Sequence, residues 1–200
     1  MSLSSIWTAI MTRYLYGTAF HRLLARVLYF PTLVRLIFKQ KVSITNWYDR
    51  IDDTVILGAL PFRSMTKELV EGEKVRAVLS YNQDYELKLF TNSLKDWEKN
   101  GVKQYVYPTW DFTPPTQKHI ADGLFVIDRE RLNKSSVYVH CKAGKGRSAT
   151  VVACYVMKRY KMVPDDAIDF IERKRPQIRM NSHQRQAITE FYENLIHKAN

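Results

Sequence analysis

Cysteine is scarce in this sequence. The 200 residues include only two cysteines, Cys141 and Cys154, which excludes a disulfide framework. So low a count is typical of a reducing compartment such as the cytosol, the nucleus or the mitochondrial matrix. Any thiol with a function is therefore expected to be free. The sequence also has no zinc-spaced cysteine and histidine cluster and no internal repeat, and we expect neither a metal nor another cofactor.

Acidic residues are absent before Asp49. That segment holds six basic residues, which are Arg13, Arg22, Arg26, Arg35, Lys39 and Lys41. The whole chain has a net charge of +11, which favours an anionic partner. Charge alone does not separate nucleic acid, an anionic membrane and a phosphorylated substrate, but no nucleic-acid-binding motif accompanies it, so nucleic acid is not expected.

The apolar run over residues 14–38 is interrupted by Pro31 and by charged residues. It is too interrupted for a transmembrane helix, which needs about 18 to 20 largely uncharged residues. An acid-free, arginine-bearing amphipathic segment is typical of mitochondrial targeting segments and of interfacial membrane helices. We expect residues 1–45 to be such a leader and residues 46–200 to form one domain. The alternative is an N-terminal helix packed on the domain with its basic residues in water.

From residue 46 onward, short apolar runs alternate with longer helical patterns. This alternation predicts an α/β domain of three layers, with a mostly parallel central sheet flanked by helices. The expected strands are residues 51–57, 75–80, 102–107 and 137–140. The expected helices are residues 64–71 with Ser64 as the cap, 86–100 stopped by Gly101, 117–132, 147–160, 164–173 and 182–197.

A thiol stands where one of these strands ends, and a glycine-containing loop leads from it into a helix. The N–H groups of such a loop can converge on one anion, and the helix N-terminus adds partial positive charge. Arg147 can bind two phosphate oxygens with its planar fork. The same field lowers the pKa of Cys141, which makes the thiolate a nucleophile for phosphorus. The predicted phosphate-binding residues are Lys142, Ala143, Gly144, Lys145, Gly146 and Arg147.

Residues 140–148 read His-Cys-x-x-Gly-x-x-Arg-Ser, where x is any residue. This is the signature of the protein tyrosine phosphatase superfamily, and the short domain resembles its dual-specificity branch. Further segments resemble the mitochondrial members that dephosphorylate phosphatidylglycerophosphate: residues 26–33, 46–51, 57–61 and 82–86. The resemblance spans residues 26 to 196, and it implies a product, phosphatidylglycerol, on the route to cardiolipin. It also implies a location at the matrix face of the mitochondrial inner membrane.

Cleavage of a phosphomonoester needs a proton for the leaving alkoxide. Asp111 fits this role because its loop, residues 107–115, directly follows an expected strand. The superfamily also has its acid loop at this place. Asp84 is the main rival. After the first step, the deprotonated acid could activate water to hydrolyse a phosphocysteine, and Ser148 could donate to the sulfur of Cys141 as it leaves.

Several other residues are expected to support the site. His140 is expected to fix the backbone behind the cysteine, and Cys154 to pack in the core. Tyr85 and Glu86 are expected to support the site from their loop. By the resemblance, three residues near the C-terminus take structural or water-positioning places: Arg175, Asn181 and Gln186.

The two lysines of the loop, Lys142 and Lys145, suit a doubly anionic lipid head group. The alternative is that both are solvated and only raise the general affinity for anions. The leading hypothesis is therefore a lipid phosphatase for phosphatidylglycerophosphate, with a phosphoinositide second. Alternatives are a dual-specificity phosphoprotein phosphatase and an inactive phosphate-binding module, which is disfavoured because Cys141, Arg147 and Asp111 are all present. The expected partners are an anionic phospholipid substrate and, through the leader, a membrane surface.

Overall fold

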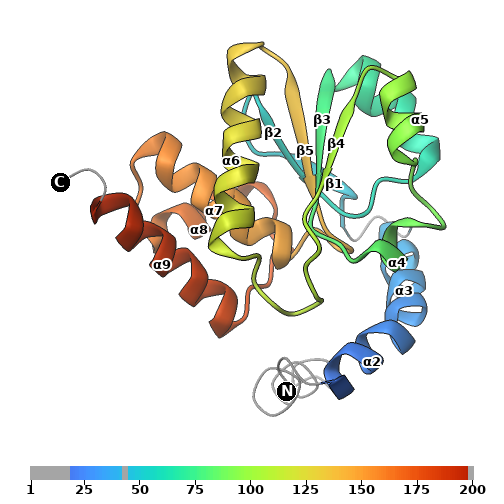
Figure 1. Ribbon diagram of the computed structural model, residues 1–200, viewed down its shortest axis with the longest axis horizontal. Coiled ribbons are helices and arrows are strands. Elements are labelled where there is room, and N and C mark those ends of the chain that lie inside the picture. The colour runs from blue at the N-terminus through green and yellow to red at the C-terminus, as the bar shows by residue number, and fades with distance from the viewer. Residues whose placement is uncertain (1–18, 42–44, 198–200) are drawn as a thin grey trace.

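The computed structural model describes residues 19–41 and 45–197. Its middle layer is a five-stranded sheet in the order β1-β2-β5-β3-β4 (Figure 1). The strands are β1 (Tyr48–Arg50), β2 (Val55–Gly58), β3 (Val75–Ser80), β4 (Lys103–Val106) and β5 (Ser136–His140). β1 pairs antiparallel with β2, and all other pairs are parallel. The predicted α/β class with a mostly parallel sheet is thus confirmed.

Helices cover both faces of this sheet (Figure 1). The helices of the described residues are α2 (Ala19–Val27), α3 (Tyr29–Lys41), α4 (Asp84–Leu87), α5 (Leu94–Lys99), α6 (Gln117–Leu132), α7 (Arg147–Tyr160), α8 (Pro164–Lys174) and α9 (Ser182–His197). A 3-10 turn, η1 (Arg63–Met65), and a π-helical turn, η2 (Glu68–Gly72), precede β3. The bounds predicted for α6, α7 and α9 are confirmed.

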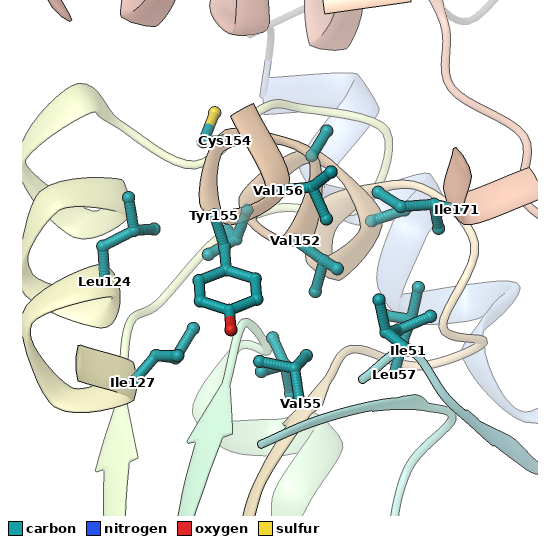
Figure 2. Packing of buried hydrophobic residues seen from close by; sticks show 14 of the residues in the cluster. Ile51, Val55, Leu57, Leu124, Ile127, Val152, Cys154, Tyr155, Val156 and Ile171 are labelled. Carbon is teal, nitrogen blue, oxygen red and sulfur yellow. The ribbon is translucent and has the colours of Figure 1, made fainter. Parts of the chain in front are cut away.

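The alternation of side chains along the strands divides the core into two layers. On β5, Val137 and Val139 pack into the larger cluster with residues of α6, α7 and α8, whereas Tyr138 packs on the other face near Trp97 of α5. Figure 2 shows the larger cluster around α7. Cys154 is fully buried there, which confirms that it is a core residue.

The predicted helix over residues 86–100 is wrong, because the chain turns within it. α4 and α5 are separate short helices. The side chain of Ser93 accepts a hydrogen bond from the amide of Asp96, and the Asp96 carboxylate accepts from the Ser93 amide, so a capping box starts a new helix inside the predicted one. The predicted end is correct, since the chain turns at Gly101 with a φ of 70°.

Two other predicted elements differ from the structure. The first half of the strand predicted over residues 51–57 is a turn, because a carboxylate oxygen of Asp52 accepts from the amides of Thr54 and Val55 at 2.8 Å. β1, which the prediction missed, lies before this turn. The helix predicted over residues 64–71 is the pair of short turns η1 and η2, and its N-cap is Phe62 rather than Ser64.

The segment expected to be a leader forms α2 and α3, and α3 lies beside α4 (Figure 1). Its inner face is buried against Trp47 and Ala59 through Tyr29, Leu33 and Leu36. This face of α3 therefore agrees with the alternative prediction, in which an N-terminal helix packs on the domain. No helix in the described part of the chain is long and apolar enough to cross a membrane. Residues 1–18 and 42–44 of the predicted leader lie outside the described residues, and mitochondrial targeting stays a prediction.

Candidate active site

Cys141 follows β5 directly, and the loop of residues 142–146 leads from it to the first turn of α7. Each carbonyl group of residues 142–146 accepts a hydrogen bond from a residue outside this loop. Lys142 O accepts from the amide of Leu60, Lys145 O from the amide of Arg179, and Gly146 O from the amide of Thr150. Arg175 donates to the two carbonyls between them, those of Ala143 at 3.3 Å and Gly144 at 2.9 Å.

Carbonyls that point outward leave the loop N–H groups to converge on the other side. Lys145 apart, the backbone amides of residues 142–147 donate to no backbone carbonyl in the turns and loops of the described residues. The loop is thus a cradle of backbone donors beside Cys141, and the helix dipole of α7 adds to its positive potential. This is the arrangement expected from the sequence.

Gly144 is the residue that lets the cradle close. Its φ is +65°, which favours glycine, and a Cβ atom placed there would lie 2.4 Å from the backbone of Gly58. The loop therefore approaches the end of β2 as closely as backbone allows.

Arg147 is 1% exposed, and neighbouring protein groups bind its guanidinium. Nη1 and Nη2 bind the two carboxylate oxygens of Glu86 at 2.7 and 3.0 Å, and Nη1 also donates to Thr109 O at 2.9 Å. The terminal edge of the guanidinium is therefore used by protein groups. Its Nε is buried and is the guanidinium nitrogen without a hydrogen-bond partner among the described residues, whereas the sequence predicted that the fork of the guanidinium binds two phosphate oxygens.

The Cys141 thiol lies in a positive environment. Burial alone raises the pKa of this thiol, but the charge of Arg147 and hydrogen bonds from the hydroxyl and amide of Ser148 outweigh burial, so the pKa lies below its ordinary value. The Ser148 hydroxyl donates to Cys141 Sγ at 3.3 Å. His140 is fully buried, where its Nε2 bonds Ser80 Oγ at 2.7 Å. Burial lowers the pKa of His140 to about 3, so the ring is neutral and structural.

Asp111 lies at this centre, whereas Asp84 is exposed at the start of α4. An Asp111 oxygen is 3.3 Å from Arg147 Nη2, and the other is 2.5 Å from Lys142 Nζ. Burial alone raises the pKa of Asp111, but the two cations hold it well below its usual range. The Lys142 side chain is only 12% exposed and also donates to Thr32 Oγ1 at 3.2 Å. Lys142 is therefore not a solvated lysine on the rim.

Residues remote in sequence hold the loop of Asp111. Phe112 has a φ of 66°, a strained value for a non-glycine residue, and its carbonyl accepts from Asn181 Nδ2 at 2.7 Å. Gln184 Nε2 donates to Thr113 O at 3.3 Å. The glutamine beside the site is thus Gln184, whereas Gln186, named in the sequence analysis, is exposed on α9.

A residue of α3 supports the active site, which the sequence did not indicate. Tyr29 is 1% exposed, and its hydroxyl donates to Glu86 O at 2.7 Å. Its ring makes an edge contact with Tyr85, with centroids 5.8 Å apart. Tyr85 and Glu86 therefore do support the site by position, and a leader residue holds their loop. The only sequence signal for Tyr29 was its place in the resembling segment, residues 26–33.

Comparisons with known proteins agree with this geometry. The sequence pattern of the dual specificity phosphatase catalytic domain matches residues 65–194. The Homo sapiens protein phosphatidylglycerophosphatase and protein-tyrosine phosphatase 1 is 41% identical over 181 residues, or 88% of this chain and 90% of that protein. The Arabidopsis thaliana phosphatidylglycerophosphate phosphatase PTPMT1 is 33% identical over 170 residues, or 84% of this chain and 49% of that protein.

A solved structure extends the similarity to three dimensions. The crystal structure of PTPMT1 in complex with PI(5)P has a TM-score of 0.76 at 38% identity, and the match covers 78% of this chain and 100% of that one. The chain belongs to the dual specificity phosphatase family, within the protein tyrosine phosphatase superfamily. Over most of its length it is similar to the relatives named for phosphatidylglycerophosphate, as the resemblance in the sequence indicated.

Proposed function

We propose that this phosphatase hydrolyses phosphatidylglycerophosphate to phosphatidylglycerol through a phosphocysteine on Cys141, as a step towards cardiolipin. The observation that carries the chemistry is the buried Arg147 with an unpartnered Nε beside a thiol of lowered pKa. The choice of lipid is supported by relatives named phosphatidylglycerophosphatase that align with 88% of this chain.

The reaction follows from the groups around the thiol. The phosphomonoester binds the inward amides and the Nε edge of Arg147, and Cys141 Sγ attacks phosphorus as the bond to the glycerol oxygen breaks. A dianionic phosphate engages the cations next to Asp111 and adds negative charge, which raises the pKa of that carboxyl so that it can carry the proton for the leaving alkoxide. The resulting carboxylate takes a proton from water as the water attacks the phosphocysteine, and Ser148 donates to the departing sulfur.

A phosphoinositide is the second candidate substrate, because a structure of PTPMT1 was solved with PI(5)P. The test compares phosphate release by one purified sample from phosphatidylglycerophosphate, several phosphoinositides and phosphotyrosine peptides. We expect the highest kcat/KM for phosphatidylglycerophosphate. A higher value for a phosphoinositide would select the second candidate, and a higher value for the peptides would favour a phosphoprotein phosphatase.

The proposal includes a membrane surface as the place of action. Five large apolar side chains follow α2 and α3 at helical spacing and are exposed: Leu23, Val27, Phe30, Val34 and Phe38. Phe30 also makes an edge contact with Phe90, with ring centroids 6.4 Å apart, whereas the other four stand apart from the inner face that packs on the domain and are available to a bilayer.

The proposed location is the matrix face of the mitochondrial inner membrane. The acid-free, arginine-bearing character of the leader supports this location. Protease protection of intact and opened mitochondria tests this location.

A further inference from the structure

Helix α2 places two arginines against the aromatic side chains next to the catalytic loops. Arg22 Cζ lies 5.4 Å from the ring centroid of Trp110, and Arg26 Cζ lies 5.3 Å from that of Tyr85. The two rings are themselves neighbours, with centroids 6.5 Å apart. Arg22 and Arg26 are one helical turn apart, so both guanidinium groups gather over one aromatic pair.

Each of the two rings belongs to a residue that directly precedes a carboxylate of the candidate active site. Trp110 precedes Asp111, and Tyr85 precedes Glu86, which binds Arg147. Burial is the main cause that raises the pKa of Tyr85 to about 12; the negative charges of Glu86 and Asp111 add to this rise, and Arg147 and Arg26 oppose it. The two arginines therefore lie against rings whose chain neighbours, Asp111 and Glu86, both contact Arg147.

Neither arginine of α2 has a salt-bridge partner among the described residues. Both Arg22 and Arg26 are exposed. Like charges at this spacing repel each other, so an anion between them would be bound favourably. A guanidinium stacked on a ring keeps its N–H edges free for oxygen ligands.

We propose that Arg22 and Arg26 form a second anion subsite, which binds the phosphodiester of a phospholipid whose terminal phosphomonoester lies in the cradle of residues 142–147. The inference rests on the proposed function, because it needs a substrate with two phosphates. Phosphatidylglycerophosphate and phosphoinositide phosphates share this chemistry. An aryl phosphate and a phosphotyrosine peptide lack the diester, so the subsite favours lipid over protein substrates.

The test uses the full chain, and the paired variant Arg22→Gln/Arg26→Gln. Arg35→Gln is the matched control, since Arg35 is exposed on α3 and stacks on no ring in the described part of the chain. The substrates are dihexanoyl phosphatidylglycerophosphate and a dihexanoyl phosphoinositide, both below their micellar concentration, and p-nitrophenyl phosphate. The deacylated head group of phosphatidylglycerophosphate, which keeps both phosphates, serves as a competitive inhibitor.

We expect the paired variant to raise KM for the soluble lipid about tenfold, and to weaken the inhibitor equally, because two charge-assisted phosphate contacts are lost. Its kcat, its rate on p-nitrophenyl phosphate and all constants of Arg35→Gln should stay unchanged. An unchanged KM for the lipid, an equal loss on p-nitrophenyl phosphate, or a defect confined to vesicles would overturn the subsite. Failure of the proposed function is seen separately, as a wild type inactive on both lipids, and would remove the subsite with it.

Discussion

At the scale of single residues, the site is a balance of charges around one thiol. The positive groups Arg147 and Lys142 face the negative groups Cys141, Asp111 and Glu86. Removing one member of such a buried set leaves its partner uncompensated, which costs about 3–5 kcal/mol. A bound dianionic substrate adds negative charge to this site and so changes the pKa of the groups next to it. The acid–base roles therefore belong to the complex with substrate.

The role of Asp111 is tested by the leaving group. Asp111→Ala should slow hydrolysis of a lipid phosphate by about 10²- to 10⁴-fold, because the alkoxide must be protonated as it leaves. An aryl phosphate should be affected much less, since its leaving group is stable as an anion. Steady-state rates with both substrates check this. Equal losses would reassign the acid, and Asp84→Ala, a change at an exposed position of α4, serves as the control.

The role of Ser148 is tested by the reactivity of the thiol. Its hydroxyl donates to Cys141 Sγ, and a hydrogen bond to the charged form of an acid lowers the pKa. Ser148→Ala should therefore raise the pKa of Cys141 and move the midpoint of its alkylation by iodoacetamide to higher pH. Mass spectrometry of the Cys141 peptide gives the rate at each pH. A midpoint that does not move would remove this role from Ser148.

The residues within the signature were predictable from sequence, whereas their distant partners were not. Cys141, Arg147 and Ser148 share a nine-residue motif whose strand, loop and helix order defines the cradle. Glu86 is 61 residues from Arg147 in the chain, and Tyr29 is 57 residues from Glu86. Only the fold brings such pairs together, so the sequence placed Glu86 near the site by resemblance and gave no partner for it.

Among the helices and strands, the predictions from sequence failed where capping and turn chemistry interrupt an apolar pattern. α6, α7 and α9 are long, and their apolar faces fix their extent. α4 and α5 are short, and the cap at Ser93 breaks a pattern that reads as one helix. The turn made by Asp52 shortened β2 in the same way. Local side-chain bonds to the backbone override periodicity at such places.

The close approach of Gly144 to the end of β2 can be tested by substitution. Gly144→Ala puts a Cβ 2.4 Å from the backbone of Gly58 at a φ of +65°, so the loop must move. We expect vanadate affinity and kcat/KM to fall at least tenfold, in line with about 1–3 kcal/mol of strain. The matched control is Gly72→Ala, where a Cβ meets nothing within 4 Å. Equal behaviour of the two variants would contradict the close approach described here.

At the scale of the whole molecule, α2 and α3 belong to the catalytic unit and also present an apolar surface. The inner face of α3 holds the loop of Glu86 through Tyr29, while the outer side chains are exposed. Removing the whole segment would therefore disturb the site as well as any membrane contact. The sequence indicated the amphipathic character of this segment, but which residues face the domain depended on the position of Trp47 and Ala59.

Substitutions separate these two roles. Val27→Ser, Val34→Ser and Phe38→Ser together change side chains that are 63%, 64% and 65% exposed. We expect binding to vesicles of anionic phospholipid to weaken on the order of 100-fold, from the lost burial of three apolar groups, with aryl phosphatase activity kept. Phe125→Ser with Leu132→Ser is the control, because these α6 residues are 71% and 74% exposed. Unchanged vesicle sedimentation would place the membrane contact elsewhere.

The central claim is that Cys141 carries the phosphoryl group of a phosphatidylglycerophosphate molecule. Rapid acid quench of the enzyme with radiolabelled phosphatidylglycerophosphate tests it most directly, because a thiophosphate ester survives acid and can be mapped to its peptide. We expect label on the Cys141 peptide of the wild type within one turnover, and neither label nor phosphate release with a folded Cys141→Ser variant. Steady phosphate release by Cys141→Ser, or turnover by the wild type with no labelled cysteine, would contradict it.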